Sequence, residues 1–473
     1  MTQRSMKRLI VCCDGTWLDS AGSFQNHMLP IPSNVTRISQ AIKPVSSDGI
    51  EQVTYYQAGI GSTGNALNRL VGGATAEGLS ENIRSAYSFI ANNYMAGDEI
   101  FLFGFSRGAF TARSIAGLID GVGLLTKAGL NYLAEVFKDF ENRENPRYRP
   151  KYPNTPFPDK PSALDPNYKI QLQNRHLSRL DIPIKVVGVW DTVGSLGIPR
   201  IEWLEKLRLQ TKSTKEYLFY DTSLNNHIEN AFQALALDEH RAAFTPSVWE
   251  KKRGVTTNLR QVWFPGVHQN IGGGYADQGQ ANITLAWMMS QVQPFIDFDV
   301  DYILEQYDQT EEHYKQTGQK VRPWSFGKIY RSMTGIYILD GRLNRTPGGY
   351  YRVDPDTGRL TGKPLRETNE YIHPSARSRI KLDGPGTEDE GIYECPALDP
   401  YKLKLMDETA GKRATFIWAP RSRRKKAVLH ELPESPLWEI EKELLRESPK
   451  MSDYVLGGAK PERSNPERSL ERR

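Results

Sequence analysis

Residues 100 to 113 read Ile-Phe-Leu-Phe-Gly-Phe-Ser-Arg-Gly-Ala-Phe-Thr-Ala-Arg. The apolar start is typical of a buried strand, and the small residues that follow are typical of a closely packed helix. Between them lies GxSxG, whose glycines, Gly104 and Gly108, let the backbone turn sharply enough to expose the hydroxyl of Ser106. This stretch predicts an α/β fold, with Ser106 as a candidate nucleophile and both glycines lining its site. The plainer alternative is a glycine-rich turn without chemistry.

A serine hydroxyl is a poor nucleophile unless a base takes its proton and a carboxylate orients that base. Asp191 follows the β-branched run 184–190, where the chain turns polar and glycine-rich. His268 lies on the loop after a second short apolar run, and the glycines 272–274 follow it. Because the carboxyl ends of parallel strands meet at one edge of a sheet, Asp191 and His268 are predicted to meet Ser106 there as carboxylate and base.

Each of these residues also has an interpretation without chemistry. Asp191 can be a turn aspartate beside Thr192, and His268 can be a histidine hydrogen-bonded to backbone. The other histidines are weaker candidates for the base. Their surroundings predict exposed or charged positions for His27, His176, His313, His373 and His430. His227 and His240 flank a helix expected over 230–240, where His240 either lines the site or, in the favoured interpretation, ends a salt-bridged helix.

The negative charge that develops on an attacked carbonyl oxygen needs amide donors. One is expected from Arg107, the residue after the candidate nucleophile. The other is expected from Gly15 or Thr16, because the first predicted strand, residues 8–13, ends just before them. Asp14 lies at the same point and either binds a cation or fixes the loop through backbone hydrogen bonds. The further residues expected to line the site are Asp14, Gly272 and Gly273.

Five ordered motifs carry a resemblance to a known family. They are Cys-Asp-Gly-Thr-Trp at 13–17, Gly-Phe-Ser-Arg-Gly-Ala-Phe-Thr-Ala-Arg at 104–113, Val-Trp-Asp-Thr-Val-Gly-Ser at 189–195, Ala-Leu-Asp-Glu-His-Arg at 236–241, and Trp-Phe-Pro-Gly-Val-His at 263–268 with Gly-Gly-Gly-Tyr at 272–275. From about residue 6 to about residue 295, the chain resembles the α/β-hydrolase family that includes the catalytic domain of bacterial type VI secretion phospholipase effectors. That family also has many uncharacterised fungal members.

The resemblance implies a Ser-Asp-His hydrolase, with Ser106, Asp191 and His268 on the family's triad positions in the chain order of α/β-hydrolases. The effectors within the family are phospholipases, so a small-molecule or lipid ester is the implied partner. Peripheral membrane contact stays open, because the membrane-associating regions of the effectors are not identifiable here. Gln269 and Asn270 stand where related sequences often carry Ser and Asp, which keeps hydrogen bonding but removes a charge.

Composition indicates a globular enzyme rather than a nucleic-acid-binding protein. The chain has 473 residues, of which 38% are hydrophobic, enough for a large core. Its 61 basic and 56 acidic residues give a net charge of +5, too mild to indicate a nucleic-acid partner. Cys12 and Cys13 face opposite sides of a strand, and with Cys395 they are expected to be buried thiols of a reducing compartment. No spacing predicts a metal site, and no cofactor is expected.

The predicted location is cytoplasmic, because the apolar run before Asp14 is too short for a signal peptide or a spanning helix. The basic run 421–426 is either a nuclear address, a contact for anionic lipid or a solvated linker.

The predicted architecture is a three-layer αβα sandwich of the α/β-hydrolase type with a mostly parallel sheet. It is expected over residues 6–295, interrupted at 142–166 by a proline-rich insertion that is either a lid or an anchored surface loop. Residues 296–420 are expected to form an aromatic extension that packs on the core or closes over the site. Residues 421–473 are expected to be a basic linker and a largely disordered tail.

Together these features predict a serine hydrolase, an esterase or phospholipase-like enzyme, that acts through an acyl-enzyme on Ser106. The alternative is a non-catalytic binding scaffold that retains the motifs. A peptidase is less favoured, because nothing in the sequence marks a peptide-binding groove.

Overall fold

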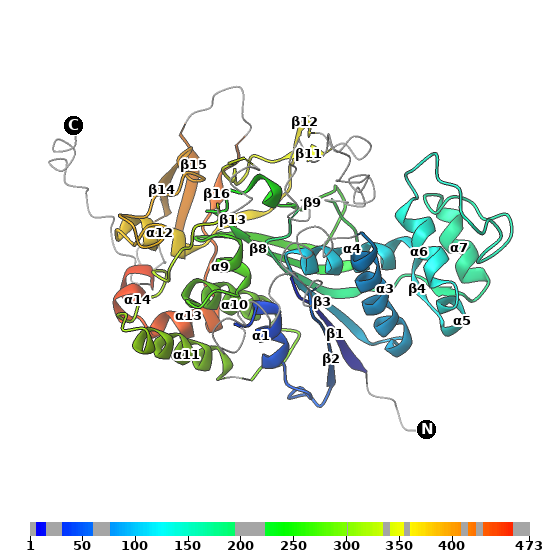
Figure 1. Cartoon of the computed structure of the whole chain (residues 1–473), viewed down its shortest axis with the longest axis horizontal. Coiled ribbons are helices and arrows are strands. Elements are labelled where there is room, and N and C mark those ends of the chain that lie inside the picture. Colours follow the sequence, from blue (N-terminus) through cyan, green and yellow to red (C-terminus); the bar gives the residue numbers. More distant parts are fainter. Residues whose placement is uncertain are drawn as a thin grey trace.

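The centre of the protein is a seven-stranded parallel β-sheet (Figure 1). The computed structural model describes residues 6–15, 31–59, 76–193, 223–299, 301–333, 341–353, 360–407, 415–421 and 429–456. Across the sheet the strands run in the order β2 (Glu51–Gln57), β1 (Lys7–Cys13), β3 (Glu99–Phe105), β6 (Ile184–Trp190), β8 (Ile228–Ala236), β10 (Asn258–Phe264) and β13 (Glu370–Ile372). Each strand pairs in parallel with its neighbours.

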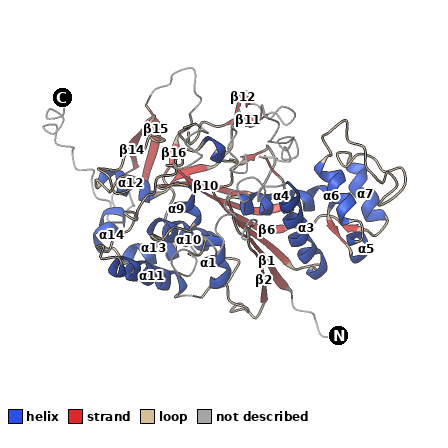
Figure 2. Ribbon diagram, in the orientation of Figure 1, coloured by secondary structure: helices blue, strands red, loops and turns tan. Residues whose placement is uncertain are grey.

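Helices cover both faces of this sheet, which confirms the predicted three-layer fold class (Figure 2). Alternate residues of a strand point to opposite faces, so Val11 of β1 joins one core and Cys12 joins the other. Among the helices that pack in the first core are α3 (Ala76–Asn93) and α4 (Arg107–Val122). Among those that pack in the second are α1 (Asn34–Ala41), α10 (Gly279–Val292), α11 (Tyr302–Gln316) and α13 (Glu439–Arg446).

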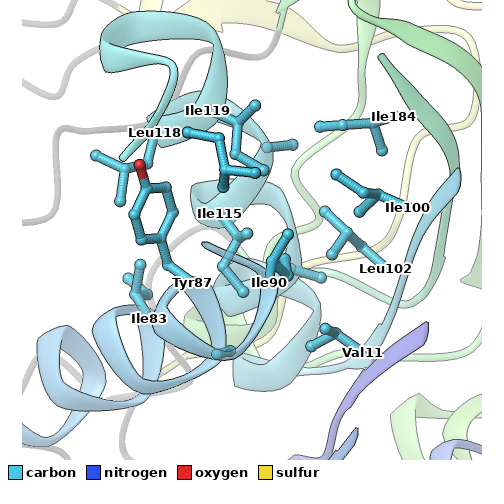
Figure 3. Packing of buried hydrophobic residues seen from close by; sticks show 14 of the residues in the cluster. Val11, Ile83, Tyr87, Ile90, Ile100, Leu102, Ile115, Leu118, Ile119 and Ile184 are labelled. Carbon is cyan, nitrogen blue, oxygen red and sulfur yellow. The ribbon is translucent and has the colours of Figure 1, made fainter. Parts of the chain in front are cut away.

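Figure 3 shows the first core at close range. Ile83, Tyr87 and Ile90 project from α3 toward the side chains of α4. Their spacing of three and four residues places them on one helix face, and that face is what the sequence buries. The Tyr87 hydroxyl donates to the Gly123 carbonyl at 2.8 Å, so the one polar atom that this residue brings into the core is satisfied.

The direction of the chain across the sheet reverses next to β1. From β1 the chain passes through α1 to β2 on one side, and it then returns to β3 on the other side of β1. In parallel sheets such a reversal leaves a crevice at the carboxyl ends of the two strands, where ligands bind. Asp14 follows β1 and Ser106 follows β3, so the topology brings two residues of the predicted site to this crevice.

Two glycines allow β1, β3 and α4 to pack closely at this point. A Cβ on Gly104 would lie 2.3 Å from the Gly108 carbonyl oxygen, and one on Gly108 would lie 2.0 Å from the Cys13 carbonyl oxygen. Both obstacles are backbone atoms, which cannot rotate away as a side chain can. The GxSxG glycines therefore fix how near the start of α4 lies to the end of β1.

Replacing Gly108 by alanine is expected to destabilise the fold by about 3 kcal/mol, because β1 and α4 would have to separate. Gly117 in the same helix is the matched control, since a Cβ there meets no atom within 4 Å. Gly117→Ala should leave stability unchanged or raise it by about 0.5–1 kcal/mol. The midpoint of urea unfolding measures both effects, and equal midpoints for the two variants would contradict this account of the packing.

Segments far along the chain complete the sheet and its second helical layer (Figure 1). The edge strand β13 comes from the extension predicted at 296–420, so that region is built into the sheet as well as packed on it. The helices α13 and α14 (Pro449–Leu456) lie within the predicted linker and tail, and α14 corrects the disorder expected of the tail at these residues. Ile440, Leu444 and Met451 are buried in the second core, which explains why the segment folds.

The remaining elements are short and lie outside the main sheet. They are β4 (Leu124–Leu125), α5 (Lys127–Leu130), α6 (Leu133–Glu141), α7 (Pro166–Asn174), β5 (Ser178–Arg179), β7 (Ser223–Leu224), the 3-10 turn Ala242–Phe244, β9 (Glu250–Lys251), α9 (His268–Gly272), β11 (Tyr351–Val353), β12 (Leu360–Pro364), α12 (Pro374–Lys381), β14 (Tyr401–Asp407), β15 (Thr415–Pro420) and β16 (Leu432–Pro433).

The proline-rich insertion lies beside α6 and α7 at one end of the molecule (Figure 1). The Asp139 carboxylate on α6 accepts hydrogen bonds from Tyr148 at 3.1 Å, Lys160 at 2.5 Å and Tyr168 at 2.8 Å. These contacts attach the insertion to its flanking helices and support the anchored-loop interpretation.

Other predictions of local structure are met in part. Residues 228–236 form the central strand β8, so the helix predicted over 230–240 is wrong. Cys12, Cys13 and Cys395 are free and buried, as predicted. Residues 422–428, which hold most of the predicted basic run, lie outside the described residues. Within the described ranges, no helix combines the length and the apolar character that crossing a bilayer requires.

Candidate active site

Ser106 occupies a sharp turn between β3 and α4. Its backbone angles are φ 57° and ψ −119°, a conformation that is rare for a residue with a side chain. Its amide donates to the Trp190 carbonyl of the neighbouring strand at 3.1 Å, which holds the turn against β6. Ser106 keeps 7% of its surface exposed. Strain of this kind at the end of a strand is typical of residues that a fold holds ready for chemistry.

Asp191 follows Trp190 at the carboxyl end of β6. Its φ of 39° is also in the left-handed region, and its amide donates to the Ala234 carbonyl of β8 at 2.7 Å. The carboxylate is fully buried. Its Oδ1 accepts from the Ala236 amide at 3.0 Å, so the backbone of the next strand fixes the side chain.

His268 is the first residue of α9, just beyond the end of β10, rather than part of a loop. Its Nδ1 lies 2.7 Å from Oδ2 of Asp191. Because a carboxylate only accepts hydrogen bonds, Nδ1 carries the proton, and Nε2 of the neutral ring is left as an acceptor. The structure thus brings the predicted carboxylate and the predicted base into direct contact.

Two aromatic rings hold the imidazole of His268 in place. The ring of Phe105, the residue before Ser106, lies 4.6 Å from it between centroids, and the Phe244 ring meets it edge-on at 4.8 Å. Gly272 leaves the space that Phe105 needs, because a Cβ there would lie 2.0 Å from that ring. Gly273, with φ 83°, forms a bridge to Ser33. Gly272 therefore makes room for the ring that packs on His268, and Gly273 joins α9 to the residue before α1.

Nε2 of His268 is buried and has no hydrogen-bond partner among the described residues. The hydrogen bond from Ser106 Oγ to this atom is therefore not formed. Such bonds are often long in ligand-free sites and shorten when substrate binds. An unused acceptor on a ring that packs against Phe105, the residue before Ser106, leaves the imidazole able to take a proton.

Burial favours the neutral form of His268. Burial, together with the charge of Arg241, lowers the pKa of His268 below its ordinary value, although Asp191 and Glu239 oppose the change. Burial alone would raise the pKa of Asp191, but Arg345 and His268 hold it below its ordinary value. A neutral imidazole beside an ionised carboxylate is the state that a general base requires.

Residues 238–241 follow the end of strand β8, rather than forming the predicted helix end, and they contact His268. Glu239 Oε2 accepts the His268 amide at 3.2 Å, and the same carboxylate pairs with the Arg241 guanidinium at 2.9 Å. Burial opposes ionisation of Glu239, yet Arg241 lowers its pKa to about 2. His240 does not line the contact between Asp191 and His268, and its Nε2 lies 3.4 Å from the Arg342 guanidinium.

Arg345, which lies between β10 and β13 along the chain, was not among the predicted site residues. Its guanidinium reaches Asp191 Oδ1 at 3.3 Å and Oδ2 at 3.1 Å, and it is buried. No motif surrounds it, and 154 residues separate it from Asp191. The one available signal was an arginine within a segment expected either to pack on the core or to close over the site.

The predicted oxyanion donors have different surroundings. Arg107 is the first residue of α4, and amides at that position point out of the helix N-terminus, where its dipole favours negative charge. The Gly15 amide donates to Oδ1 of Asp14 at 2.7 Å, so it is already engaged. Thr16 lies outside the described residues.

Asp14 is held by hydroxyl groups. Its Oδ2 accepts from Ser33 at 2.6 Å, Thr36 at 2.9 Å and Tyr56 at 2.7 Å. Burial raises the pKa of Asp14 despite these donors. With the bond from Gly15, the contacts fit the loop-fixing role that was one of its two predicted roles. A Cβ on Gly15 would lie 3.2 Å from the Ser106 Cβ, so this loop lies directly against the serine.

A second hydrogen-bonded series of serine, histidine and carboxylate lies beside the edge strand β13. His373 Nδ1 is 2.7 Å from Ser375 Oγ, and its Nε2 is 2.9 Å from Glu441. The prediction that His373 is exposed is wrong, because α13 covers it, and burial lowers its pKa to about 3. Ser375 is fully buried, so a substrate cannot reach its hydroxyl. These hydrogen bonds connect α13 to the edge of the sheet.

Comparisons with known proteins identify a family that the chain matches. A family model described as "T6SS, Phospholipase effector Tle1-like, catalytic domain" matches residues 7–291. The chain is also 29% identical over 256 residues to the uncharacterised protein YEL023C of Saccharomyces cerevisiae. That match covers 51% of this chain and 32% of the yeast protein, so the chain spans about a third of that relative's length.

Two solved structures are similar in part. A crystal structure of an uncharacterised protein from Pseudomonas aeruginosa has a TM-score of 0.34 and 17% identity, over 67% of this chain and 52% of that one. A structure of the Tle1 effector bound to the VgrG spike from the type 6 secretion system has a TM-score of 0.35 and 15% identity, over 78% of this chain and 94% of that one. Neither score is high enough to carry an argument.

Proposed function

Because the chain belongs to the Tle1-like phospholipase effector family of the type VI secretion system, whose catalytic-domain model its residues 7–291 match, we propose that it is a serine hydrolase of carboxylic or lipid esters. The observation that carries the proposal is the buried Asp191–His268 hydrogen bond of 2.7 Å, with an unused Nε2 on the far side of the ring. Ser106 belongs to the strained turn that follows Phe105, whose ring packs on His268. The fold is of the α/β-hydrolase type in this proposal.

In the proposed reaction, Ser106 Oγ attacks the ester carbonyl carbon while His268 Nε2 takes its proton. The imidazolium that forms is stabilised by Asp191 through the Nδ1 hydrogen bond. His268 then gives the proton to the leaving alcohol oxygen, and the acyl group remains on Ser106. Water, deprotonated by the same Nε2, attacks the acyl-enzyme and releases the carboxylic acid. Each proton taken is returned, so the enzyme ends as it began.

The oxyanion of each tetrahedral intermediate needs donors that are already in place. The Arg107 amide is the first, since it lies at the N-terminus of the sixteen-residue helix α4. Thr16 is the second candidate, because the Gly15 amide would first have to leave Asp14. The hydroxyl shell of Asp14 keeps that carboxylate occupied and limits its repulsion of the oxyanion.

The first choice of substrate is a lipid ester, with contact at a membrane surface. One observation supports it: the family that the chain matches is described as one of phospholipase effectors. The alternative is a binding scaffold without activity. One observation favours it, the missing hydrogen bond between Ser106 and His268.

A hydrolysis panel tests the proposal and separates these alternatives. The full chain is incubated with short p-nitrophenyl esters and with vesicles of phosphatidylcholine and phosphatidylglycerol, and released p-nitrophenol or fatty acid is measured. We expect turnover of the vesicles above that of the short esters, and none by Ser106→Ala. Turnover of short esters alone would reject the lipid substrate. Folded protein that releases no acid from any substrate would favour the scaffold.

A further inference from the structure

Arg345 reaches the candidate site from outside the region that the family model matches. It follows residue 291 by more than fifty positions, whereas Asp191 and His268 both lie inside the matched range. The guanidinium donates Nη1–H to Oδ1 of Asp191 at 3.3 Å and Nη2–H to Oδ2 at 3.1 Å. Only 3% of its side chain is exposed, so solvent does not screen this ion pair.

The same guanidinium also touches the wall around the imidazole. Oδ2 of Asp191, which accepts from Arg345, is the oxygen that accepts Nδ1–H of His268 at 2.7 Å. Nη2 of Arg345 donates at 2.7 Å to the carbonyl of Phe244, whose ring meets the His268 ring edge-on. One side chain therefore fixes the carboxylate and the aromatic wall together.

We propose that Arg345 is a positioning residue for the reaction: it holds Asp191 and Phe244 around His268 and balances the carboxylate charge, so that the C-terminal extension completes the site of the matched domain. This inference rests on the proposed function, in which His268 is the base. It also assigns that extension a part in the chemistry.

The charged groups around His268 make the consequence specific. Asp191 from the end of β6 and Glu239 from the end of β8 carry the negative charges, and Arg241 and Arg345 carry the positive ones. His240 is the further titratable group near Arg345. If Arg345 is replaced by a neutral residue, the negative charge of Asp191 is no longer balanced by it. Asp191 then stabilises the imidazolium form of His268 more strongly. The base then stays protonated, and inactive, up to a higher pH.

Removing the charge is therefore expected to raise the pKa of His268 by about one pH unit. The protein is labelled with ¹³C at histidine Cε1, and the His268 resonance is identified as the one that His268→Asn removes. Its titration is followed in native protein and in Arg345→Gln. Arg342→Gln is the matched control, since Arg342 is an exposed arginine of the same segment that contacts His240 and not Asp191. The control should titrate like the native protein.

The pH dependence of kcat/KM gives the second measurement. The acid limb should move upward by about one pH unit in Arg345→Gln, which lowers kcat/KM about tenfold on the acid side of the native limb. Arg345→Lys, which keeps the charge, should return the limb toward the native position. A side chain with a merely structural role would lower the plateau and the unfolding temperature without moving the limb. An unmoved limb and an unmoved His268 titration in folded Arg345→Gln would overturn the inference.

The inference can also be tested if Arg345→Gln fails to fold. Arg345→Met fills a similar space and carries the same expectation as Arg345→Gln. If neither folds, Asp191→Asn combined with Arg345→Gln should fold, because no unpaired carboxylate remains buried. Failure of this double variant would contradict the charge balance. The NMR titration does not require an active enzyme. If the pKa of His268 rises in Arg345→Gln but the native protein hydrolyses no ester, only the proposed function is rejected. If the native protein hydrolyses esters but the pKa of His268 is unchanged in Arg345→Gln, only this inference is rejected.

Discussion

Replacing Ser106 by alanine is expected to lower kcat/KM for the preferred ester by about 10⁴- to 10⁶-fold. The hydroxyl oxygen is the atom that forms the acyl bond in the proposed reaction. The turn itself should survive in this variant. The hydrogen bond from its amide to the Trp190 carbonyl and the close packing of Gly104 and Gly108 involve backbone atoms only. Steady-state kinetics on purified protein measure the loss, and the midpoint of urea unfolding verifies the fold.

Ser375 supplies the matched control for this variant. Its hydroxyl bonds His373, a histidine that contacts a carboxylate, but Ser375 is fully buried under α13. Ser375→Ala should therefore keep kcat/KM near the native value while losing about 1 kcal/mol of stability. Comparable activity losses in the two variants would mean that the effect is structural. Native-like activity in folded Ser106→Ala would reject Ser106 as the nucleophile.

Replacing Asp191 by asparagine is expected to lower kcat/KM by about 10⁴-fold. Both oxygens of Asp191 accept hydrogen bonds, Oδ1 from Ala236 and Oδ2 from His268, and Arg345 donates to each. An amide NH₂ in either place donates where an acceptor is needed. When it faces His268, the ring must accept at Nδ1 and carry its proton on Nε2, and it can then no longer take a proton from serine. Steady-state kinetics at the pH of the native plateau measure the loss.

Asp238 is the matched control for Asp191. It is a buried carboxylate at the end of the next strand, and it accepts from the Gly266 amide and from the Tyr393 hydroxyl instead of from His268. Burial raises its pKa to about 6. Asp238→Asn should change kcat/KM by less than about tenfold. If Asp191→Asn falls no further than this control, Asp191 does not orient the base.

Much of the candidate site could be predicted because its residues stand directly after strands. The sequence around Ser106 contains the strand, the turn and the helix that present it, and the parallel sheet brings the ends of β6 and β10 to the same edge. Local patterns and topology were sufficient to predict that Asp191 and His268 lie at this edge. Their mutual contact at 2.7 Å depends in addition on the positive φ of Asp191, which no local pattern indicates.

Features that depend on tertiary packing escaped sequence analysis. β8 lies in the middle of the sheet and is buried on both faces, so it lacks polar alternation, and its alanines and leucines favour a helix. Burial against the sheet overrides that preference. Arg345 and His373 were missed for a related reason. Each contacts a residue distant along the chain, and neither is part of a pattern around its own position.

Labelling with a fluorophosphonate tests the central claim, that Ser106 is an activated nucleophile, without assuming any substrate. The full native chain is treated with the probe, and the adduct is located by mass spectrometry of its peptides. We predict one adduct, on Ser106, and no labelling of folded Ser106→Ala or His268→Ala. Folded native protein that stays unlabelled, or that carries the adduct on another serine, would contradict the account.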